Sequence, residues 1–314
     1  MDRLDVRIFL AMGTRNYIFH GGLSRQLNLR LIAKELGVDP DTVKARIKKM
    51  EESSFIQYYQ VFPNFRLFGL QCVAIGLSFS DPAAKKEALQ KLELIEEVGW
   101  IDERLNSLRA LLLCREAEAD LAKKLALVEE LTGAKPIRLN YLEMPPVQVE
   151  LNLMDWMIIR SIRYDARKPT AQVAKELGLT ARGVNYRLQR LVRGNAFFIV
   201  PVINMENLEN VIFSYFTFFF DETLRAEAID AITQLIGEKS MSRMVDSEGS
   251  VGFCVLNSNI TESEEDYLKA KIIRGVEKVA LDFPRRCHDI SVCVDKLIDD
   301  KIAELEKTAK QAKE

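Results

Sequence analysis

Apolar and polar residues follow one another along this chain in an order that occurs twice. The segment Ile32–Met50, IAKELGVDPDTVKARIKKM, returns as Val173–Leu191, VAKELGLTARGVNYRLQRL, with most positions identical or conservatively replaced. Each copy predicts a short helix, a turn that contains Gly, and a second helix with one apolar and one basic face. The helical period places on the apolar face Val43, Ile47 and Met50 in the first copy, and Val184, Leu188 and Leu191 in the second.

Capping residues and flanking segments extend the repeat on both sides. Asp39 and Pro40 are typical of the N-cap and first turn of a helix, and Thr180 takes the cap position in the second copy. A short amphipathic helix precedes each copy, over residues 4–12 and 153–162. A segment rich in aromatic and β-branched residues follows each copy, FIQYYQVFPN or AFFIVPVIN, so we expect a strand after each second helix.

The rest of each half alternates between strand-like and helical patterns. In the first half the order is CVAIGLSF, a helix from Pro82 to Val98, an extended stretch from Trp100, ALLLC, a helix from Ala117 to Leu131, and PIRLNYLEM. In the second half it is IFSYFTFFF, a helix from Leu224 to Gly237, SMSRMV, VGFCVL, a helix from Glu262 to Val279, and CHDISVCV. Both orders predict the β-α-β-β-α-β arrangement of a ferredoxin-like domain.

These patterns predict an α+β protein made of two repeats of a winged helix-turn-helix domain and a ferredoxin-like domain. The expected helix-turn-helix domains are 1–66 and 149–206, the ferredoxin-like domains are 67–148 and 207–296, and a helix-prone tail over 297–314 frays from Lys307 onward. Aromatic residues crowd IFSYFTFFF, so we expect helices to bury one face of that sheet and a second sheet to bury the other. The second sheet comes either from residues 70–142 or from another copy of the chain.

Composition and charge narrow the class of protein. The 314 residues are 48% hydrophobic and 29% charged, with a formal net charge of -2 and a pI near 6.0. The sequence has no uncharged apolar run long enough to cross a membrane and does not open on a signal-peptide pattern, so we expect a cytoplasmic protein. Because the bulk charge does not favour nucleic acid, DNA binding has to come from local basic patches.

The five cysteines lie in apolar runs without CxxC spacing: Cys72, Cys114, Cys254, Cys287 and Cys293. We therefore expect reduced, buried thiols. Cys287, His288 and Cys293 could ligate a metal together with Cys254, but three of these residues fall on one predicted strand, and the sequence has no paired ligand motif. Packing in the core is the preferred interpretation, and we expect neither a metal nor a cofactor.

The motifs resemble those of the Lrp/AsnC transcription regulators. The resemblance covers nearly the whole chain and rests on Leu4 and Asp5, on Ala33–Gly37 and Ala174–Gly178, and on the V-x-x-R pattern at Val43, Arg46 and Ile47 and at Val184, Arg187 and Leu188. Members of this family usually carry one such unit and dimerise through their ferredoxin-like domains, so the resemblance implies a fused dimer. The family's glycine-acidic effector signature is not reproduced, so the resemblance implies no particular effector.

The second helices of the two copies present different outward faces. The first places Asp41, Lys44, Ala45 and Lys48 outward with Arg46 and Lys49 at the edges, and the second places Arg182, Asn185, Tyr186 and Gln189 outward with Arg187 and Arg190 at the edges. Asn and Gln can bond bidentately to adenine, whereas lysines are better suited to phosphates. Our hypothesis is that the second copy specifies sequence in double-stranded DNA and the first mainly anchors the protein.

Two other functions fit the same sequence. Siroheme decarboxylases are built on a similar Lrp-like unit and depend on histidines, but this chain has only His20 and His288 and lacks that family's HNYxR-like stretch. The helix-turn-helix units could also have exchanged DNA for a protein partner. The sequence contains no GxGxxG, P-loop, GxSxG or HExxH motif, so we do not expect an enzyme. The preferred interpretation is a transcription regulator that binds double-stranded DNA and can form homo-oligomers through its ferredoxin-like sheets, with an unknown effector.

Overall fold

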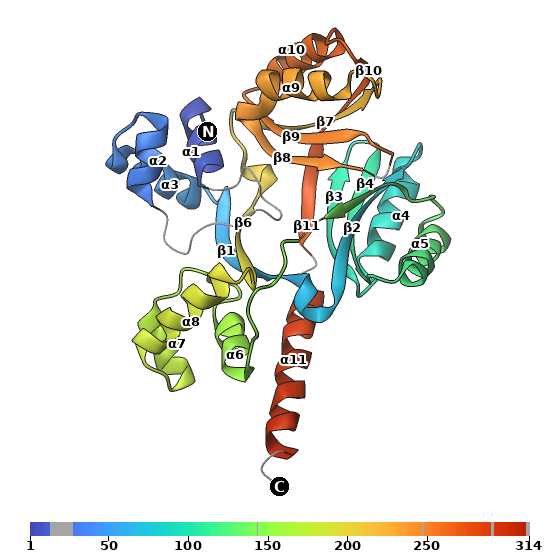
Figure 1. The fold of residues 1–314 in the computed structure, drawn as a ribbon. Coiled ribbons are helices and arrows are strands. Elements are labelled where there is room, and N and C mark those ends of the chain that lie inside the picture. Colours follow the sequence, from blue (N-terminus) through green and yellow to red (C-terminus); the bar gives the residue numbers. More distant parts are fainter. Residues whose placement is uncertain (13–27, 143, 247, 290–291, 312–314) are drawn as a thin grey trace.

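The computed structural model shows two helix-turn-helix units and two β-sheets that carry helices on their outer faces (Figure 1). It describes residues 1–12, 28–142, 144–246, 248–289 and 292–311. The first unit contains α1 (Arg3–Ala11), α2 (Leu29–Leu36) and α3 (Pro40–Glu52), and β1 (Ile56–Pro63) follows it. The second contains α6 (Leu153–Ser161), α7 (Thr170–Leu177) and α8 (Ala181–Arg193), and β6 (Phe197–Ile203) follows it. The predicted repeat of helices and following strand is confirmed in both halves.

A sheet domain follows each helix-turn-helix unit in sequence. The first contains β2 (Leu70–Ser78), α4 (Pro82–Leu92), β3 (Val98–Arg104), β4 (Ser107–Arg115), α5 (Glu118–Thr132) and β5 (Ile137–Leu142). The second contains β7 (Ile212–Phe220), α9 (Arg225–Ile236), β8 (Ser240–Val245), β9 (Val251–Asn257), α10 (Ile260–Lys271) and β10 (Val276–Asp282). Short 3-10 helices are η2 (Phe65–Phe68), η3 (Met205–Asn207) and η4 (Gly237–Lys239). The predicted α+β class is confirmed.

The last strand of the second half differs from the prediction. Residues CHD belong to β11 (Pro284–Asp289), which pairs antiparallel with β3 and completes the sheet of the first half in the order β11-β3-β4-β2-β5. The fourth strand of the second sheet is β10 instead, and the order there is β10-β7-β9-β8. The prediction was wrong because the charged sequence of β10, VEKVALD, continues the helical pattern of α10, and because β11 pairs with a strand far away in the sequence.

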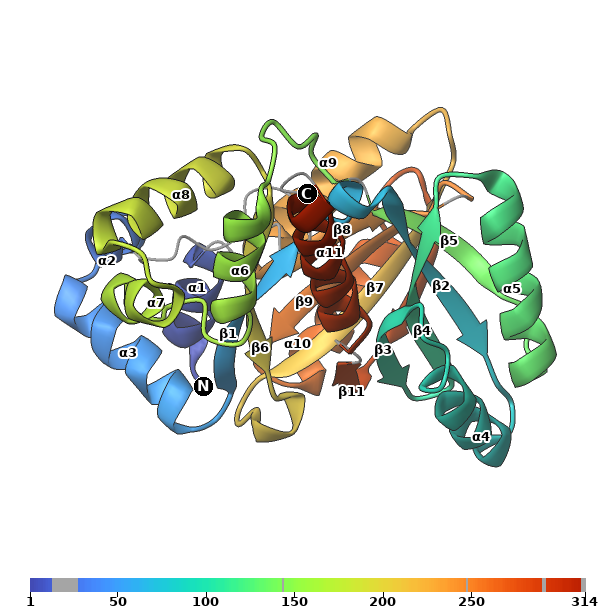
Figure 2. The same cartoon turned by 90° about the horizontal axis from the view of Figure 1, so that it is seen from below.

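The two sheets pack face to face within the chain, so part of the core lies between them (Figure 2). Nearly every side chain of β7 is buried. Phe216 and Phe218 lie in the cluster that contains Ile232 of α9, whereas Phe213 lies in the cluster that contains Leu111 of β4. The expectation that both faces of this sheet are buried is confirmed, and the covering sheet comes from the same chain.

The strands β1 and β6 pair with each other and thereby join the two helix-turn-helix units. The pairing is antiparallel and runs from Ile56 opposite Ile203 to Pro63 opposite Phe197. Arg163 strengthens this junction, because its buried guanidinium donates to the side chain of Gln60 and to the carbonyl of Val61, each at 2.8 Å. In both views the two units lie on the side of the molecule away from the sheet that contains β2 and β4 (Figures 1 and 2).

The C-terminal helix α11 (Val292–Gln311) begins inside the segment predicted as a strand and continues past Lys307, where we expected fraying. Asp295 forms an ion pair with Arg163 at 3.1 Å, and Asp299 forms one with Arg160 at 2.8 Å, so α11 packs along α6. The helix extends through this segment because its carboxylates pair with arginines of α6 and of the loop after α6, and because its apolar side chains pack there. Within the described parts of the chain, no helix combines the length and the apolar character needed to span a membrane.

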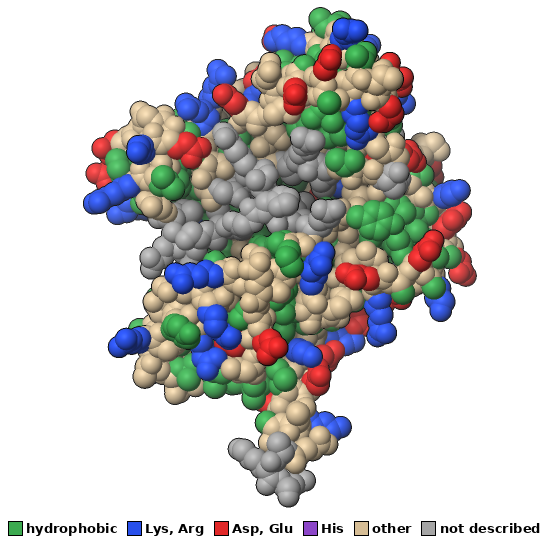
Figure 3. Space-filling model, viewed as in Figure 1, with side chains coloured by type: hydrophobic (Ala, Val, Ile, Leu, Met, Phe, Trp, Pro, Cys, Tyr) green, Lys and Arg blue, Asp and Glu red, His purple; other side chains and the backbone are tan. Residues whose placement is uncertain are grey.

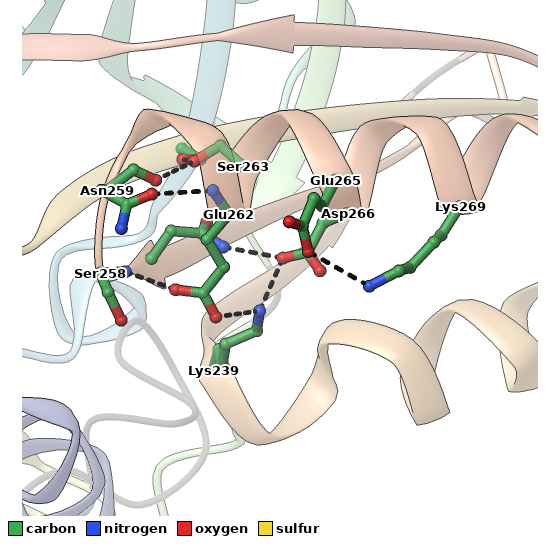
Figure 4. A network of polar contacts seen from close by, with 10 residues as sticks. Lys239, Ser258, Asn259, Glu262, Ser263, Glu265, Asp266 and Lys269 are labelled. Atoms are coloured by element: carbon green, nitrogen blue, oxygen red, sulfur yellow. Dashed lines mark hydrogen bonds and ion pairs between the residues drawn. The ribbon is translucent and has the colours of Figure 1, made fainter.

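A polar network fixes α10 against η4 and the end of β9 (Figure 4). Lys239 donates to Asp266 Oδ2 at 2.6 Å and to Glu262 Oε1 at 2.8 Å, and Asn257 donates to Asp266 Oδ2 at 2.7 Å. Burial opposes the ionisation of Glu262, but hydrogen bonds from Lys239 and from the backbone N–H of Ser258 lower its pKa to about 2. Glu262 is therefore ionised at neutral pH, and the network holds α10 on the second sheet.

Candidate nucleic-acid interface

Both helix-turn-helix turns are formed by a glycine in the left-handed region. Gly37 ends α2 with a φ of 68°, and its N–H donates to the carbonyl of Ala33. Gly178 ends α7 with a φ of 66°, and its N–H donates to the carbonyl of Ala174. Glycine adopts this conformation without the steric cost that a Cβ brings. The turn predicted from the repeated Leu-Gly sequence is confirmed in both units.

The second helix of each unit begins at the predicted N-cap. The Asp39 carboxylate accepts from the N–H of Asp41 at 2.7 Å, and Pro40 occupies the first turn of α3. The Thr180 hydroxyl accepts from the N–H of Gly183 at 3.0 Å. A Cβ on Gly183 would lie only 3.1 Å from this hydroxyl, so the glycine leaves room for the cap. Both predicted caps are confirmed.

The predicted inward and outward faces of α3 and α8 are also confirmed. Buried on the inward faces are Val43, Ile47 and Met50 in α3, and Val184, Leu188 and Leu191 in α8. Exposed on the outward faces are Asp41, Lys44, Ala45 and Lys48 in α3, and Arg182, Asn185, Tyr186 and Gln189 in α8, and the edge residue Lys49 is exposed as well. The space-filling view shows Lys and Arg side chains on the surface of both units (Figure 3). Contact of these residues with DNA stays a prediction.

Arg46, at the edge of α3, forms ion pairs with its own protein. Its guanidinium binds Asp2 and lies 3.0 Å from Asp5 Oδ1, and both carboxylates belong to the capping box of α1. The side chain of Asp5 is only 2% exposed, so the pair joins α3 to α1 at an inner position. Hydrogen bonds to Asp2 and then to Asp5 raise the pKa of Arg46. Desolvation raises the pKa of Asp2, but the hydrogen bonds from Arg46 and the backbone bring it below its ordinary value.

The second unit repeats this arrangement with one more arginine. Arg187 donates to Asp155 Oδ1 at 2.8 Å and to Asn152 Oδ1 at 3.2 Å. Arg190 binds the other carboxylate oxygen of Asp155 and donates to the carbonyl of Glu150 at 3.1 Å. Asp155 is fully buried and forms the capping box of α6 with Asn152. One buried carboxylate therefore holds two arginines of α8.

All three edge arginines predicted to contact DNA thus hold ion pairs within the chain. These arginines are predicted to contact DNA only because the helical period places them at the edges of the outward faces. A sequence signal for the pairing does exist, because Asp5 with Arg46 and Asp155 with Arg187 occupy equivalent places in the repeat. Contact of these three arginines with DNA stays a prediction, as it does for the exposed residues of α3 and α8.

A family model described as winged helix-turn-helix DNA-binding matches residues 151–195, which contain α6, α7 and α8. The chain therefore contains a winged helix-turn-helix DNA-binding domain. A segment of 98 residues is 29% identical to the HTH-type transcriptional regulator Ptr1 of Methanocaldococcus jannaschii and covers 31% of this chain and 60% of that protein. The match thus spans less than two thirds of that relative. The winged helix-turn-helix domain and this homologue confirm the resemblance to transcription regulators.

Over nearly its whole length the chain has the fold of the siroheme decarboxylase NirDL. The two structures superpose with a TM-score of 0.56 at 14% sequence identity, over 96% of this chain and 99% of that chain. An AsnC family transcriptional regulator from Agrobacterium tumefaciens aligns with 43% of this chain and 91% of its own, at 15% identity and a TM-score of 0.35. The likeness to NirDL confirms the predicted fold of helix-turn-helix and ferredoxin-like units, and at this identity it shows the fold alone.

The residues considered for a metal site come from three elements. Cys287 and His288 lie on β11, Cys254 lies on β9 and Cys293 lies on α11, so the expectation that three of them share one strand was wrong. Among the described residues, no three or more His, Cys, Asp or Glu side chains lie close enough together to hold a metal ion. His20 lies outside the described residues.

The cysteines differ in exposure. Cys72, Cys114 and Cys293 are buried, as the apolar sequence around them predicted. Cys254 is half-buried and Cys287 is exposed, which corrects the expectation of five buried thiols. Cys287 is exposed because it lies on β11, which is an edge strand of the first sheet and not a strand of the second sheet.

Proposed function

We propose that this chain is a cytoplasmic, sequence-specific DNA-binding transcription regulator of Lrp/AsnC type, in which two helix-turn-helix units form a pseudodimer. The observation that carries the proposal is the second unit, which matches the winged helix-turn-helix family model and exposes Asn185, Tyr186 and Gln189 on α8. The amide side chains can bond bidentately to adenine in the major groove. The neighbouring Arg182 can bond to guanine in the same way.

The first unit has a different part in this proposal. It exposes Lys44 and Lys48 at the positions where the second unit exposes Asn185 and Gln189. Lysines bind phosphates as point charges and carry little sequence information, so this unit anchors the protein. Two recognition helices in one chain would address major grooves roughly 34 Å apart. The preferred operator is an imperfect repeat, because the two halves differ.

Association of several copies through the ferredoxin-like domains is part of the proposal. The inner faces of the two sheets already cover each other within one chain. A homo-oligomer would therefore use the outer surfaces of these domains. Light scattering on the purified protein measures this assembly directly.

Selection of binding sites from random duplex DNA, followed by a salt titration of the selected site, tests the function. We expect enrichment of two unequal half-sites, and a logarithm of affinity that falls linearly with the logarithm of salt concentration. Lys269→Ala on α10, which removes an exposed lysine outside the helix-turn-helix units, serves as the control and should leave the slope unchanged. Absence of enrichment together with absence of binding at low salt would refute the proposal.

A second candidate is chemistry on a tetrapyrrole, as the name of NirDL states for that protein. The observation that favours it is a cavity between the two sheets lined by Arg104 and Arg109, because guanidinium groups bind carboxylates. Incubation with siroheme, followed by mass spectrometry of the tetrapyrrole, distinguishes the two functions. Loss of carbon dioxide from siroheme would favour the enzyme, and recovery of unchanged siroheme would exclude this activity.

A further inference from the structure

The ion-pair cluster of the second helix-turn-helix unit carries one positive charge more than its carboxylate balances. The carboxylate of Asp155 is fully buried, and its two oxygens bind one guanidinium each, that of Arg187 at 2.8 Å and that of Arg190. The residue that caps α6 beside them, Asn152, is uncharged. Two guanidinium groups therefore share a single negative charge, and the cluster is cationic.

The equivalent cluster of the first unit has the opposite balance. There the carboxylates of Asp2 and Asp5 both bind Arg46, so two negative charges face one guanidinium. Lys49, which stands in the place of Arg190, is exposed and is not part of this cluster. A guanidinium that already faces two carboxylates attracts a further anion only weakly, whereas the arginines of the second unit keep an excess of positive charge.

The second cluster also keeps hydrogen-bond donors that are open to solvent. Arg187 uses Nη1 for its contacts with Asp155 and with Asn152, and Arg190 uses Nη1 and Nη2. Among the described residues, Nε and Nη2 of Arg187 and Nε of Arg190 have no partner, yet none of them is a buried nitrogen. The two side chains are 30% and 34% exposed, so a ligand can reach these donors from outside.

Contacts within the chain hold the guanidinium groups beside the outward face of α8. Arg190 donates from Nη1 to the backbone carbonyl of Glu150 at 3.1 Å, in addition to its bond with Asp155. The helical period places Arg190 one turn after Tyr186, which is 69% exposed on the outward face. A group bound at this edge would lie beside the groove that the outward face is proposed to enter. The arginines need little further ordering when it binds.

A phosphate of the DNA backbone is the anion that fits this position. Arginines bind phosphate oxygens through charge-assisted hydrogen bonds from their planar donor groups. The site is an open edge of the protein, so it does not surround a small free anion. A DNA strand that is held by the rest of α8 would carry its phosphate to this edge.

We propose that Arg187 and Arg190 form a phosphate clamp, which binds one backbone phosphate of double-stranded DNA beside the bases that α8 reads. The first unit has no counterpart of this clamp, because its edge arginine, Arg46, faces two carboxylates. The second unit thus combines base contacts with a fixed phosphate contact, while the first holds DNA through flexible lysines. This inference rests on the proposed function, since it requires that the chain binds DNA.

Salt titrations of the selected DNA site test the clamp with three matched variants. Arg187→Met and Arg190→Met each remove one guanidinium. Each should weaken binding about fivefold and reduce the salt slope by up to about 0.9, the value for one phosphate contact. Arg46→Met removes the equivalent arginine of the first unit and should keep the slope of the wild type. Circular dichroism checks that each variant is folded.

A neutral methylphosphonate, introduced in turn at each phosphate that flanks the two half-sites, tests the contact from the side of the DNA. We expect its largest effect beside one half-site only, where it should weaken binding of the wild type about fivefold. At that position the same replacement should change the affinity of Arg190→Met by less than about twofold, because the contact is already lost. A purely structural role of Arg190 would give no such coupling to a single phosphate.

Arg190→Lys keeps the positive charge, so it should keep most of the salt slope that Arg190→Met loses. The clamp is overturned if neither methionine variant of the clamp changes the slope, if Arg46→Met changes it as much, or if no phosphate shows the coupling. If the methionine variants do not fold, the scan of the wild type decides, because equal effects beside both half-sites overturn the clamp.

Two other outcomes separate the clamp from its alternatives. Binding of inorganic phosphate to the wild type at millimolar concentration, without coupling to a DNA phosphate, would indicate a site for a free anion and overturn the clamp. A wild type that binds no DNA at any salt concentration would refute the proposed function together with the clamp. DNA binding without the coupling would refute the clamp alone.

Discussion

The two recognition helices share their backbone geometry but not their exposed surface. Both α3 and α8 follow a left-handed glycine, begin at a side-chain N-cap and bury three apolar residues at the same spacing. On the outside, Lys44 and Lys48 of α3 stand where α8 has Asn185 and Gln189. The buried positions and the turn are therefore shared by the two units, while the exposed positions differ between them.

The units also differ in how the recognition helix is held to the first helix. In the first unit one arginine, Arg46, reaches the buried Asp5. In the second unit Arg187 and Arg190 share the buried Asp155. Charge-assisted hydrogen bonds to a buried carboxylate stabilise more than exposed pairs do. We therefore expect the second unit to depend more strongly on its carboxylate than the first.

The largest expected effect comes from removing that carboxylate. Asp155→Ala leaves Arg187 and Arg190 without their partner and removes the capping box of α6, so we expect a loss of about 3 kcal/mol in the free energy of unfolding. Asp5→Ala, the matched change in the first unit, should cost about 1–2 kcal/mol, because one arginine is affected. Urea unfolding followed by circular dichroism measures the loss in both variants. Equal losses would contradict the difference between the units.

The next effect concerns base preference. Asn185→Ala or Gln189→Ala should reduce discrimination at one half-site by about 1–3 kcal/mol, because each removes a bidentate contact to a base. Lys48→Ala, at the position in α3 equivalent to Gln189, should weaken binding without changing the preferred sequence. Repeating the site selection with each variant measures this difference. Full preference in the α8 variants, with lost preference in the Lys48 variant, would reverse the roles of the two helices.

The comparison also shows what the sequence could predict. The turns, caps and buried faces of the two units followed from local patterns, since Gly37, Asp39 and Val43 act on their neighbours in the chain. The pairing of β11 with β3 did not follow, because the strands come from different halves and no local pattern encodes their register. The ion pair of Arg46 with Asp5 was missed for a similar reason, since it joins two helices separated by a long segment.

The inter-sheet cavity was beyond sequence reasoning altogether. Arg104 and Tyr215 belong to different halves and meet only because the sheets pack face to face. The burial of the sheet faces was predictable from the aromatic residues of β7, but the place where polar residues interrupt the contact was not.

A smaller effect tests the anchoring part of the first unit. Lys44→Ala should weaken binding to all DNA sequences alike, by less than tenfold, and reduce the steepness of the salt dependence by about 0.9. The reason is that a variant with one phosphate contact fewer releases fewer counterions from the DNA when it binds. The salt titration measures the slope, with Lys269→Ala as the control outside the unit. An unchanged slope together with altered base preference would mean that Lys44 reads bases.

The smallest effect separates the N-caps of the two first helices. Asp2 caps α1, whereas the equivalent cap of α6 is Asn152, which does not titrate. Folding lowers the pKa of Asp2 below its ordinary value of 3.8. The contribution of its charge to the free energy of unfolding is therefore fully present above pH 3.8 and is lost as the pH falls through the lowered pKa of the folded protein. Asp2→Asn keeps the cap and removes the charge, so it should cost a few tenths of a kcal/mol at pH 7, as expected for a partly exposed pair.

The pH dependence of the unfolding midpoint decides whether charge is the cause. The midpoints of the wild type and of Asp2→Asn should differ at neutral pH and converge as the carboxylate that binds Arg46 becomes protonated. Asn152→Asp gives the opposite change, because it introduces a carboxylate beside Arg187 and should make the second unit sensitive to acid. If the unfolding midpoints of the wild type and of Asp2→Asn still differ after Asp2 is protonated, the charge of Asp2 is not the cause of the difference. The two caps would then be alike in charge dependence, and only the number of arginines on the buried carboxylate would distinguish the units.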